Sequence, residues 1–253
     1  MKKTKETKGT QATASKNATS LRSLESPASL DSKDPAAVQA AFAQIAKRYD
    51  LANHVLSLGL DFVWRHRAAA LVAATQPRRV LDVATGSGDL AVSLKRACRN
   101  AEVVGMDFCA PMLDIARRKG VNAVEGDALA MPFCTGEFDA VTVAFGLRNM
   151  TSYRDALLEM KRVLRPDGFL LVMDFSMPRL FAAPYRFYLH RILPVFAGLL
   201  TGRSETYRYL GDSIETFPRN EAMQSLLAEC GFTPLPPRAL AGGIAAIHSA
   251  HSQ

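Results

Sequence analysis

Apolar and polar positions alternate along most of this chain with the periods of strands and helices, and only the first 33 residues lack such a pattern. Residues 1–33 consist mainly of lysine, threonine, serine and alanine and hold almost no large apolar side chain. Such a segment cannot bury enough surface to offset the entropy lost on ordering. The pattern therefore predicts a disordered basic tail over residues 1–33 and one folded domain over residues 34–253.

The middle of the folded part repeats a strand and a helix several times. Short apolar runs typical of buried strands occupy residues 79–84, 102–107, 122–127, 138–146 and 168–176. The helix predicted over residues 152–164 is the best defined, because Ser152 and Asp155 form a capping box ahead of one apolar stripe. Such alternation predicts an α/β fold with a doubly wound, mainly parallel sheet that helices cover on both faces.

An N-terminal helical segment is expected ahead of the sheet. Asp34 and Pro35 suit a helix cap and first turn, and apolar residues follow at helical spacing. Four hydrogen-bonding side chains interrupt the apolar pattern farther on, namely Tyr49, Asp50, Asn53 and Ser57. The pattern alone is typical of an amphipathic helical hairpin packed on the sheet.

The first predicted strand holds Asp82 and ends in a glycine-rich turn, Gly86-Ser87-Gly88, that leads into a helix. A strand that runs through such a turn into a helix directs backbone N–H groups to one point and leaves room for a nucleotide-like ligand. A tight turn that needs positive φ angles would use glycine in the same way. The turn alone therefore does not decide between a structural and a binding role.

Ligands of doubly wound sheets bind at the carboxyl ends of the strands, where the strand order reverses. Asp107 ends the second strand, 19 residues after Gly88, near the spacing at which an acid binds ribose hydroxyls. The third and fourth strands place further candidates at the same edge, namely Asp127, Ala128, Ala144, Arg148 and Asn149.

Two ligand classes fit this edge. Gly86, Gly88 and Ala91 match the GxGxxA fingerprint of dinucleotide sites, so a nicotinamide-dependent oxidoreductase stays open. The other ligand is S-adenosylmethionine, which has a ribose and an adenine but no phosphate. Asp82 favours S-adenosylmethionine, because a carboxylate at the mouth of the turn repels a pyrophosphate but attracts ammonium and sulfonium groups. Asp127 also suits the adenine amino group as an acceptor.

Several longer motifs resemble known enzymes. DVATGSGD with Asp107, the Asp127-Ala128 pair and LLEMKRVLRPDGFLLV resemble the class I S-adenosylmethionine-dependent methyltransferases. More narrowly, YDLANHVLSLGLDFVWR, AFGLRNMTSYRDAL, RVLRPDGFLLVMDFS and YRYLGDSIETFP resemble the quinone-biosynthesis C-methyltransferases, which act on demethylmenaquinol or on the methoxy-polyprenyl-benzoquinol precursor of ubiquinone. The likeness runs from about Ala36 to the C-terminus. It departs from the family's usual Met, His, Thr and Glu at Ala52, Asp61, Ser87 and Asp174.

The resemblance implies a fold, a reaction and a set of site residues. The expected fold is a Rossmann-like, seven-stranded sheet with a helical insertion after the fifth strand, and the expected reaction is C-methylation of a polyprenyl quinol by S-adenosylmethionine. Implied contacts with the methyl donor are at Ser87, Asp107, Asp127, Ala128 and Ala144. Arg148 and Asn149 are expected to hold the quinol oxygen and stabilise a phenolate, while Tyr49, Asp50 and Asn53 close over the substrate.

The sequence leaves alternatives open for the role of Arg148 and for the function of the chain. Arg148 can instead serve only as one half of an ion pair. The chain can also be a methyltransferase for another small aromatic acceptor, or a non-catalytic relative that binds the quinol. The intact glycine turn with Asp107, together with Arg148 and Asn149, argues against a non-catalytic relative, which has no need of both sites.

Charge and cysteine content further limit the classes of protein to which this chain can belong. The net charge of +7 comes mostly from residues 1–22, which hold six basic residues against Glu6 alone, so the folded part is close to neutral. A nucleic-acid-binding domain should be basic itself, so none is expected. The four cysteines have irregular spacing and no CxxC pair, which predicts neither a zinc site nor a disulfide framework but a reducing compartment. No metal is expected.

A helical substrate cover is expected over residues 178–215. Its apolar and aromatic part is interrupted by Arg186, His190 and Arg191, and its longest uncharged run, ILPVFAGLL, is far shorter than the roughly 20 residues that span a bilayer. We expect this cover to touch the membrane surface, where a polyprenyl quinol resides. Ordinary lid packing or a homodimer contact is the alternative. The protein is accordingly expected in the cytoplasm, peripheral to the inner face of the membrane, and an organellar address in the basic tail is the less favoured alternative.

Overall fold

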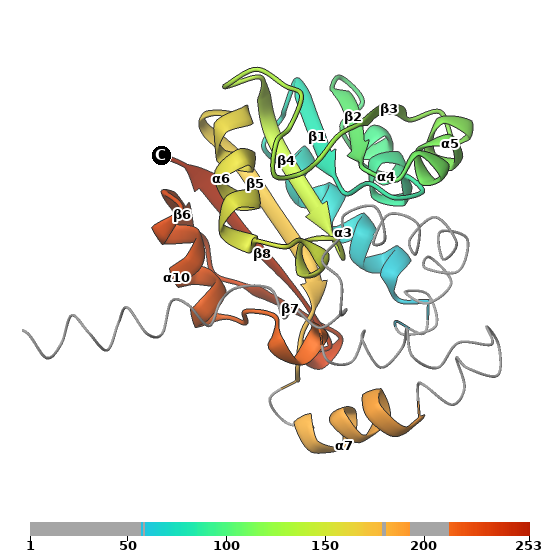
Figure 1. The fold of residues 1–253 in the computed structure, drawn as a ribbon, viewed down its shortest axis with the longest axis vertical. Helices are drawn as coiled ribbons and strands as arrows, with labels where there is room; N and C mark the ends of the chain where they lie inside the picture. The colour runs from blue at the N-terminus through green and yellow to red at the C-terminus, as the bar shows by residue number, and fades with distance from the viewer. Residues whose placement is uncertain (1–56, 58, 179–180, 193–212) are drawn as a thin grey trace, which may run out of the picture.

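The computed structural model describes residues 57, 59–178, 181–192 and 213–253, and its centre is one sheet with the strand order β3-β2-β1-β4-β5-β8-β6 (Figure 1). Strands β1 to β5 pair in parallel, and β8 pairs antiparallel to β5. The strands are β1 (Arg79–Val83), β2 (Glu102–Asp107), β3 (Asn122–Glu125), β4 (Phe138–Ala144), β5 (Leu164–Phe175), β6 (Phe232–Pro234), β7 (Arg238–Leu240) and β8 (Ala245–Ser252).

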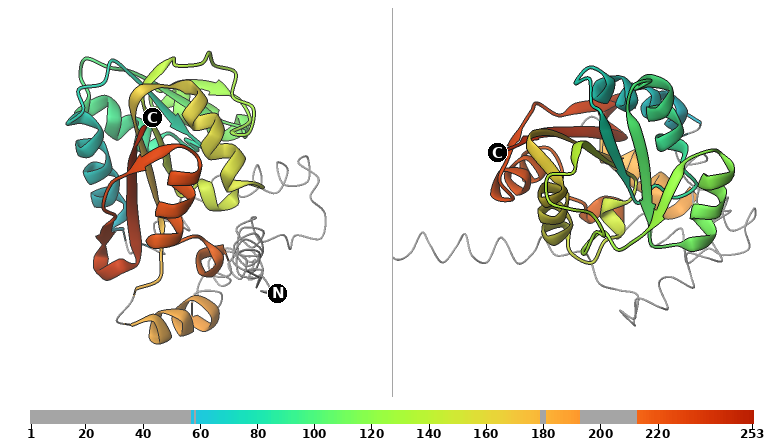
Figure 2. Two further views of the ribbon diagram at one scale, coloured as in Figure 1. Left: turned by 90° about the vertical axis from the view of Figure 1, so that its left-hand side faces the viewer. Right: turned by 90° about the horizontal axis from the view of Figure 1, so that it is seen from above.

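Helices cover both faces of this sheet, as Figure 2 shows. They are α3 (Asp61–Ala73), α4 (Asp89–Ala97), α5 (Ala110–Arg118), α6 (Tyr153–Val163), α7 (Ala182–Phe187) and α10 (Glu221–Glu229). One buried core joins α3 and α4 to the sheet, and a second core joins α6 and α10 to its other face. The predicted doubly wound, mainly parallel α/β fold is confirmed.

Local sequence signals account for the clearest of these boundaries. Ser152 caps α6, since its Oγ accepts the Asp155 backbone N–H at 3.2 Å, which confirms the predicted capping interaction. The apolar stripe behind this cap, including Tyr153 and Leu157, is fully buried in the second core. The cap therefore determines where α6 begins. The spacing of the apolar residues determines which face of α6 packs on the sheet.

The predicted count of seven strands is wrong by one, because the outer strand beside β8 is divided in two. β6 pairs with one end of β8 and β7 with the other. Between them the Leu235 N–H still donates to the Ser249 carbonyl at 2.8 Å, but Pro236 and Pro237 have no N–H to continue the ladder. Over the described residues, the sheet thus has eight strands in seven positions.

The helical insertion after β5 is described only in part. Its described residues form α7 and a π-helical turn, η3 (Tyr188–Ile192). The remainder of the expected cover over residues 178–215, the tail over 1–33, and Tyr49, Asp50 and Asn53 lie outside the described residues. Among the helices that the structure describes, none has both the length and the apolar character needed to cross a bilayer.

Candidate cofactor and substrate site

The glycine turn after β1 wraps closely around the end of β2. The Thr85 N–H donates to the Met106 carbonyl at 2.9 Å, and the Gly88 N–H returns to the Thr85 carbonyl at 2.9 Å. Gly86 and Gly88 have φ angles of +56° and +83°, which glycine adopts without steric cost. The turn therefore delivers α4 with its N-terminus at the carboxyl edge of the sheet.

Gly88 is also required for packing, because the absence of a side chain lets the start of α4 approach α5. A Cβ atom at Gly88 would lie 2.9 Å from the Ala116 Cβ and 3.0 Å from the Val121 Cγ2. We expect Gly88→Ala to lower the free energy of unfolding by roughly 2–4 kcal/mol, the sum of overpacking and backbone strain. Gly120→Ala is the matched control, since Gly120 has a φ of +79° but a Cβ atom there would meet no described atom within 4 Å. Urea unfolding of both variants checks this, and equal losses would show that packing against α5 does not matter.

Asp107, the last residue of β2, presents a carboxylate beside the glycine turn. Its Oδ2 accepts the Gly86 N–H at 2.8 Å and its Oδ1 accepts the Cys109 N–H at 2.9 Å, with the residue 7% exposed. The two oxygens of a carboxylate are suitable acceptors for the two hydroxyls of a vicinal diol. The two backbone contacts hold the carboxylate in one orientation beside the glycine turn.

Asp82 places a second, fully buried carboxylate at the base of the same turn. Its two oxygens accept the Thr85 and Thr142 hydroxyls, each at 2.7 Å. Burial raises the pKa of Asp82 to about 6, although the two threonines and Arg65 oppose that shift. A buried carboxylate that is ionised at neutral pH favours a cationic group beside it. A ligand with a ribose and a positively charged amino-acid end, as in S-adenosylmethionine, fits Asp107 and Asp82 together.

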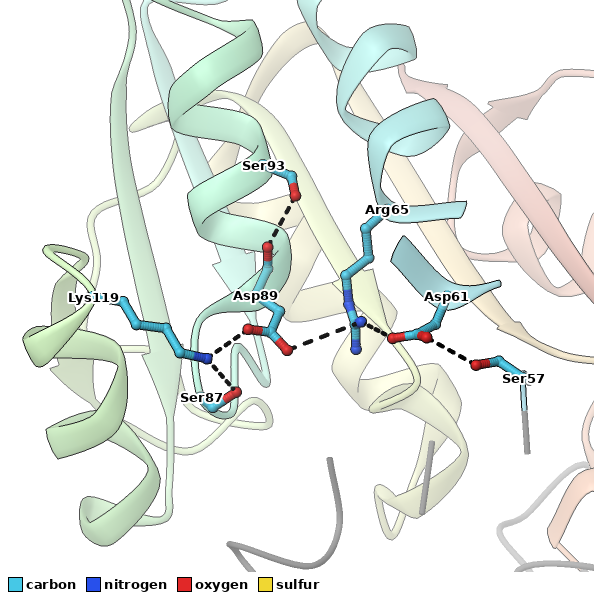
Figure 3. A network of polar contacts seen from close by, with 7 residues as sticks. All are labelled: Ser57, Asp61, Arg65, Ser87, Asp89, Ser93 and Lys119. Carbon is cyan, nitrogen blue, oxygen red and sulfur yellow. Dashed lines mark hydrogen bonds and ion pairs between the residues drawn. The ribbon is translucent and has the colours of Figure 1, made fainter. Parts of the chain in front are cut away.

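Helix α3 is tied to the glycine turn by the polar network in Figure 3. Arg65 pairs with Asp61 one turn earlier on α3 and lies 3.9 Å from the Asp89 Oδ2 at the start of α4. Lys119 donates to Asp89 and, at 3.1 Å, to the Ser87 Oγ, while the Ser57 Oγ donates to Asp61 at 2.8 Å. The network fixes Ser87 and the N-terminus of α4 relative to α3. No pattern in the sequence indicated the role of Arg65 here.

The ends of the neighbouring strands complete the edge. In sheet order, Asp127 after β3, Asp107, the glycine turn and Ala144 at the end of β4 follow one another. Asp127 is exposed, and its Oδ1 accepts the Leu129 N–H at 2.9 Å; Ala128 and Ala144 are half-buried. The structure thus brings the predicted cofactor residues to one edge of the sheet.

Two non-glycine residues at this edge have left-handed backbones. Ala84 follows β1 with a φ of +51°, and Phe145 follows β4 with a φ of +57°. Phe145 is held by its N–H bond to the Met173 carbonyl at 2.8 Å and by ring contacts with Trp64 and Phe175. Such strain is concentrated at functional sites. Nothing in the residue types predicted it.

Arg148 lies in the short 3₁₀ helix η2 (Leu147–Asn149) directly after β4, and it is buried in an ion pair with Asp174 of β5. Its Nη1 also donates to the Phe145 carbonyl at 2.8 Å, and its Cζ lies 5.4 Å from the centre of the Phe175 ring. The Asn149 amide donates to the same Phe145 carbonyl at 3.4 Å. The ion pair, which was the alternative role for Arg148, therefore exists, and it lies at the end of the two strands beside the cofactor edge.

Asp174 is the site residue that the sequence pattern missed. It is 2% exposed, and burial raises its pKa above the usual range of aspartate although Arg148 opposes the shift. The available signal was a single acid inside the apolar run LLVMDFS, which a buried strand tolerates only with a partner. Among the described residues, no group of three or more His, Cys, Asp or Glu side chains could hold a metal ion.

Solved structures with this fold include enzymes of different activities. A SAM-dependent methyltransferase from Thermotoga maritima matches with a TM-score of 0.53 and 18% identity, over 84% of this chain and 98% of that one. The cyclase SpnF matches with a TM-score of 0.55 and 18% identity, over 74% of this chain and 80% of that one. These likenesses establish the Rossmann-like methyltransferase fold and nothing finer.

Similar sequences are more specific. The demethylmenaquinone methyltransferase of Thermus thermophilus is 49% identical over 215 residues, which cover 82% of this chain and 97% of that protein. The enzyme of the same name from Deinococcus radiodurans is 47% identical over 83% of this chain and 90% of that protein. The ubiquinone/menaquinone biosynthesis C-methyltransferase UbiE of Geotalea uraniireducens is 38% identical over 83% and 94%. The model of the ubiE/COQ5 methyltransferase family matches residues 29–252, and the chain therefore belongs to that family.

Proposed function

We propose that this chain transfers the methyl group of S-adenosylmethionine to a ring carbon of a polyprenyl quinol, with demethylmenaquinol as the acceptor. Family membership decides against the nicotinamide-dependent oxidoreductase that the glycine pattern left open. The choice of acceptor is supported by the two relatives at 47–49% identity, both named demethylmenaquinone methyltransferase. The observation that carries the choice of cofactor is the pair of carboxylates, Asp82 and Asp107, beside one glycine turn.

Different residues at this edge of the sheet bind different parts of S-adenosylmethionine. In this proposal Asp107 receives the ribose hydroxyls, and Asp82 with the turn Gly86-Ser87-Gly88 attracts the cationic amino-acid end. Asp127, Ala128 and Ala144 flank the adenine and the ribose from the neighbouring strand ends. S-adenosylmethionine supplies an electrophilic methyl group on a sulfonium, so the chain has to align the acceptor carbon and keep water out.

Arg148 and Asn149 act on the acceptor. A quinol carbon becomes a strong nucleophile when its neighbouring oxygen carries negative charge. The guanidinium of Arg148 holds a positive charge at the ends of β4 and β5, and this charge stabilises such a phenolate. Tyr49, Asp50 and Asn53 remain candidates for closing over the substrate.

The described part of the insertion supports contact with the membrane surface. Phe181 and Phe187, at the two ends of α7, are 42% and 60% exposed, and Arg186 beside them is basic. Arg186 pairs with Glu215 at 2.6 Å, so the exposed aromatic rings are the main support for contact with the interface of a lipid bilayer. In this proposal residues 34–253 form the methyltransferase domain, and the cover over residues 178–215 receives the polyprenyl quinol from the membrane.

A methyl-transfer assay with two acceptors tests the proposal. Labelled S-adenosylmethionine is offered with a reduced demethylnaphthoquinol or a reduced methoxy-benzoquinol, each with a short prenyl tail. We expect label in the naphthoquinol. Asp107→Asn is expected to weaken binding of S-adenosylmethionine by about 100-fold, because an amide offers one acceptor where the carboxylate offers two and is neutral.

Asp114→Asn is the matched control for that substitution. Asp114 is an exposed residue of α5 whose carboxylate forms a surface pair with Arg117, so its loss should leave binding and methyl transfer unchanged. Tight binding of the methyl donor with no label in either quinol would contradict the quinol acceptor and favour another small aromatic one. Full affinity in Asp107→Asn would contradict the assigned ribose site.

A further inference from the structure

Two buried polar atoms, one on the ion-pair partner of Arg148 and one on α7, have no hydrogen-bond partner among the described residues. They are the Oδ2 of Asp174 and the hydroxyl oxygen of Tyr185. Asp174 is 2% exposed and Tyr185 is 8% exposed, so water does not readily satisfy either atom. Leaving a buried polar atom without a partner costs free energy, and such atoms in a native fold call for an explanation.

Both residues interact electrostatically with Arg148. The Oδ1 of Asp174 is already engaged by Arg148 and by the Phe175 N–H at 2.8 Å, which leaves Oδ2 as the available acceptor. Tyr185 comes from α7, in the insertion after β5, and Arg148 acts on its phenol electrostatically. Burial raises the pKa of Tyr185 well above its usual value, so its hydroxyl keeps its proton and can donate it in a hydrogen bond. A carboxylate acceptor and a hydroxyl donor together suit a ligand that carries phenolic oxygens.

We propose that Asp174 is the catalytic base that takes the proton of the quinol hydroxyl through Oδ2, and that Tyr185 donates a hydrogen bond to the bound quinol. This inference rests on the proposed function. Asp174 lies one residue beyond Met173, which pairs with Ala144 at the end of β4, so the base lies at the edge where the acceptor has to meet the methyl donor.

The steps balance without a further reactant. The quinol O–H bond breaks, its proton moves to Asp174, and the electron pair left on oxygen is delocalised into the ring. The ring carbon forms a bond to the methyl group while the carbon–sulfur bond breaks, with its electron pair going to sulfur. The methylated carbon then loses its hydrogen as a proton to water, and Asp174 returns its proton to the oxygen. One proton is released for each methyl group transferred.

The ionisable groups on the elements around Asp174 suit this role. Arg148 stabilises the ionised carboxylate and then the phenolate, while burial of Asp174 raises its pKa and makes it a stronger base than an exposed aspartate. Tyr185 stays neutral. His248 lies on the adjoining strand β8, two residues from the Ala246 that pairs with Asp174, and burial lowers its pKa to about 4, so it is neutral above that pH. Among these groups only Asp174 combines a carboxylate oxygen that has no partner in the described structure with a pKa raised by burial, which suits a proton acceptor.

Asp174→Asn is the first test, measured in the full chain with labelled S-adenosylmethionine and a reduced short-tailed demethylnaphthoquinol. We expect kcat at pH 7 to fall by at least about 100-fold, with the affinity for S-adenosylmethionine nearly unchanged. The deficit should shrink as the pH rises toward about 10, where a phenol ionises unaided. Asp174→Glu keeps the carboxylate and should recover most of the rate. An Asn variant with normal kcat, or one with the same deficit at every pH, would overturn the role as base.

Tyr185→Phe tests the same site in a variant whose folding is not at risk, because it removes only an oxygen that lacks a partner in the described structure. We expect kcat to fall by roughly 5–10-fold, the value of one hydrogen bond, while thermal stability stays equal or rises. Unchanged kcat and KM in Tyr185→Phe would remove Tyr185 from the site. Wild-type protein that labels no quinol at all would contradict the proposed function itself, and active wild-type protein with insensitive variants would contradict only this inference.

Discussion

Replacing Asp82 by asparagine is expected to stabilise the protein and at the same time to weaken its hold on S-adenosylmethionine. The pKa of Asp82 is raised from 3.8 to about 6 in the fold, mainly by burial. A carboxyl group that binds its proton more tightly in the folded state makes the ionised fold less stable, and two pKa units correspond to about 3 kcal/mol. Asparagine removes that penalty, and its amide can still meet the hydroxyls of Thr85 and Thr142.

The sign of this effect sets its pH dependence. Below about pH 4 Asp82 is protonated in both states, so the two proteins should be equally stable. The advantage of Asp82→Asn should develop between about pH 4 and 6 and reach at most about 3 kcal/mol above pH 6, which raises Tm by up to roughly 10 °C in a protein of this size. Over the same interval the wild-type affinity for S-adenosylmethionine should rise, because only the ionised carboxylate attracts the ligand's cationic end. Thermal unfolding and calorimetric titration at pH 5 and pH 8 measure both effects.

Asp139 provides the matched control. It lies near the start of β4, at the opposite edge of the sheet, and accepts the Arg78 and Arg79 N–H groups at 2.9 and 2.8 Å. These bonds and Arg165 outweigh burial and lower its pKa. Asp139→Asn should therefore reduce stability at neutral pH and leave cofactor binding unchanged. If Asp82→Asn bound S-adenosylmethionine as tightly as the wild type, the assigned role of Asp82 would be wrong.

The features that the sequence predicted well are those set by neighbouring residues. The strand that precedes the glycine turn, the cap of α6 and the acid that ends β2 each follow from a short pattern, and each is present. Once the strands are expected to be parallel, their carboxyl ends share one edge, which is why Asp107, Asp127 and the glycine turn could be grouped from the sequence. Local sequence patterns, together with the rule that ligands bind at the carboxyl ends of parallel strands, were therefore enough to predict these features.

The features that the sequence did not predict depend on contacts between distant segments. Arg148 and Asp174 are 26 residues apart and meet only because β4 and β5 pair in a particular register. The link from Arg65 to Asp89 depends likewise on how α3 packs on α4. The left-handed backbone of Phe145 has no signature at all in its residue type, since surrounding structure imposes it. Side-chain periodicity carries no information on any of these three.

The largest loss of stability is expected from Arg148→Met. The guanidinium is fully buried and pairs with the buried carboxylate of Asp174, so its removal leaves that charge without compensation. Breaking such a pair costs about 3–5 kcal/mol. Because the pKa of Asp174 is already raised and loses the opposing effect of Arg148, the variant's deficit should grow as the pH rises above the usual titration range of aspartate. Urea unfolding at several pH values measures the deficit, and methyl transfer should fall below detection.

A double variant distinguishes two causes of the lost stability. One is the charge of Asp174 without a partner, and the other is the lost packing of the Arg148 side chain. Arg148→Met combined with Asp174→Leu replaces the pair by apolar side chains of similar size, which is often neutral or stabilising in a protein interior. We expect it to recover most of the stability and its pH independence, but none of the methyl transfer. Arg154→Met, which breaks an exposed pair with Glu229 at 3.6 Å, should cost at most about 1 kcal/mol and preserve activity. If the double variant were as unstable as Arg148→Met alone, the loss would come from packing against Phe175, and the ion pair would serve the reaction rather than the stability of the fold.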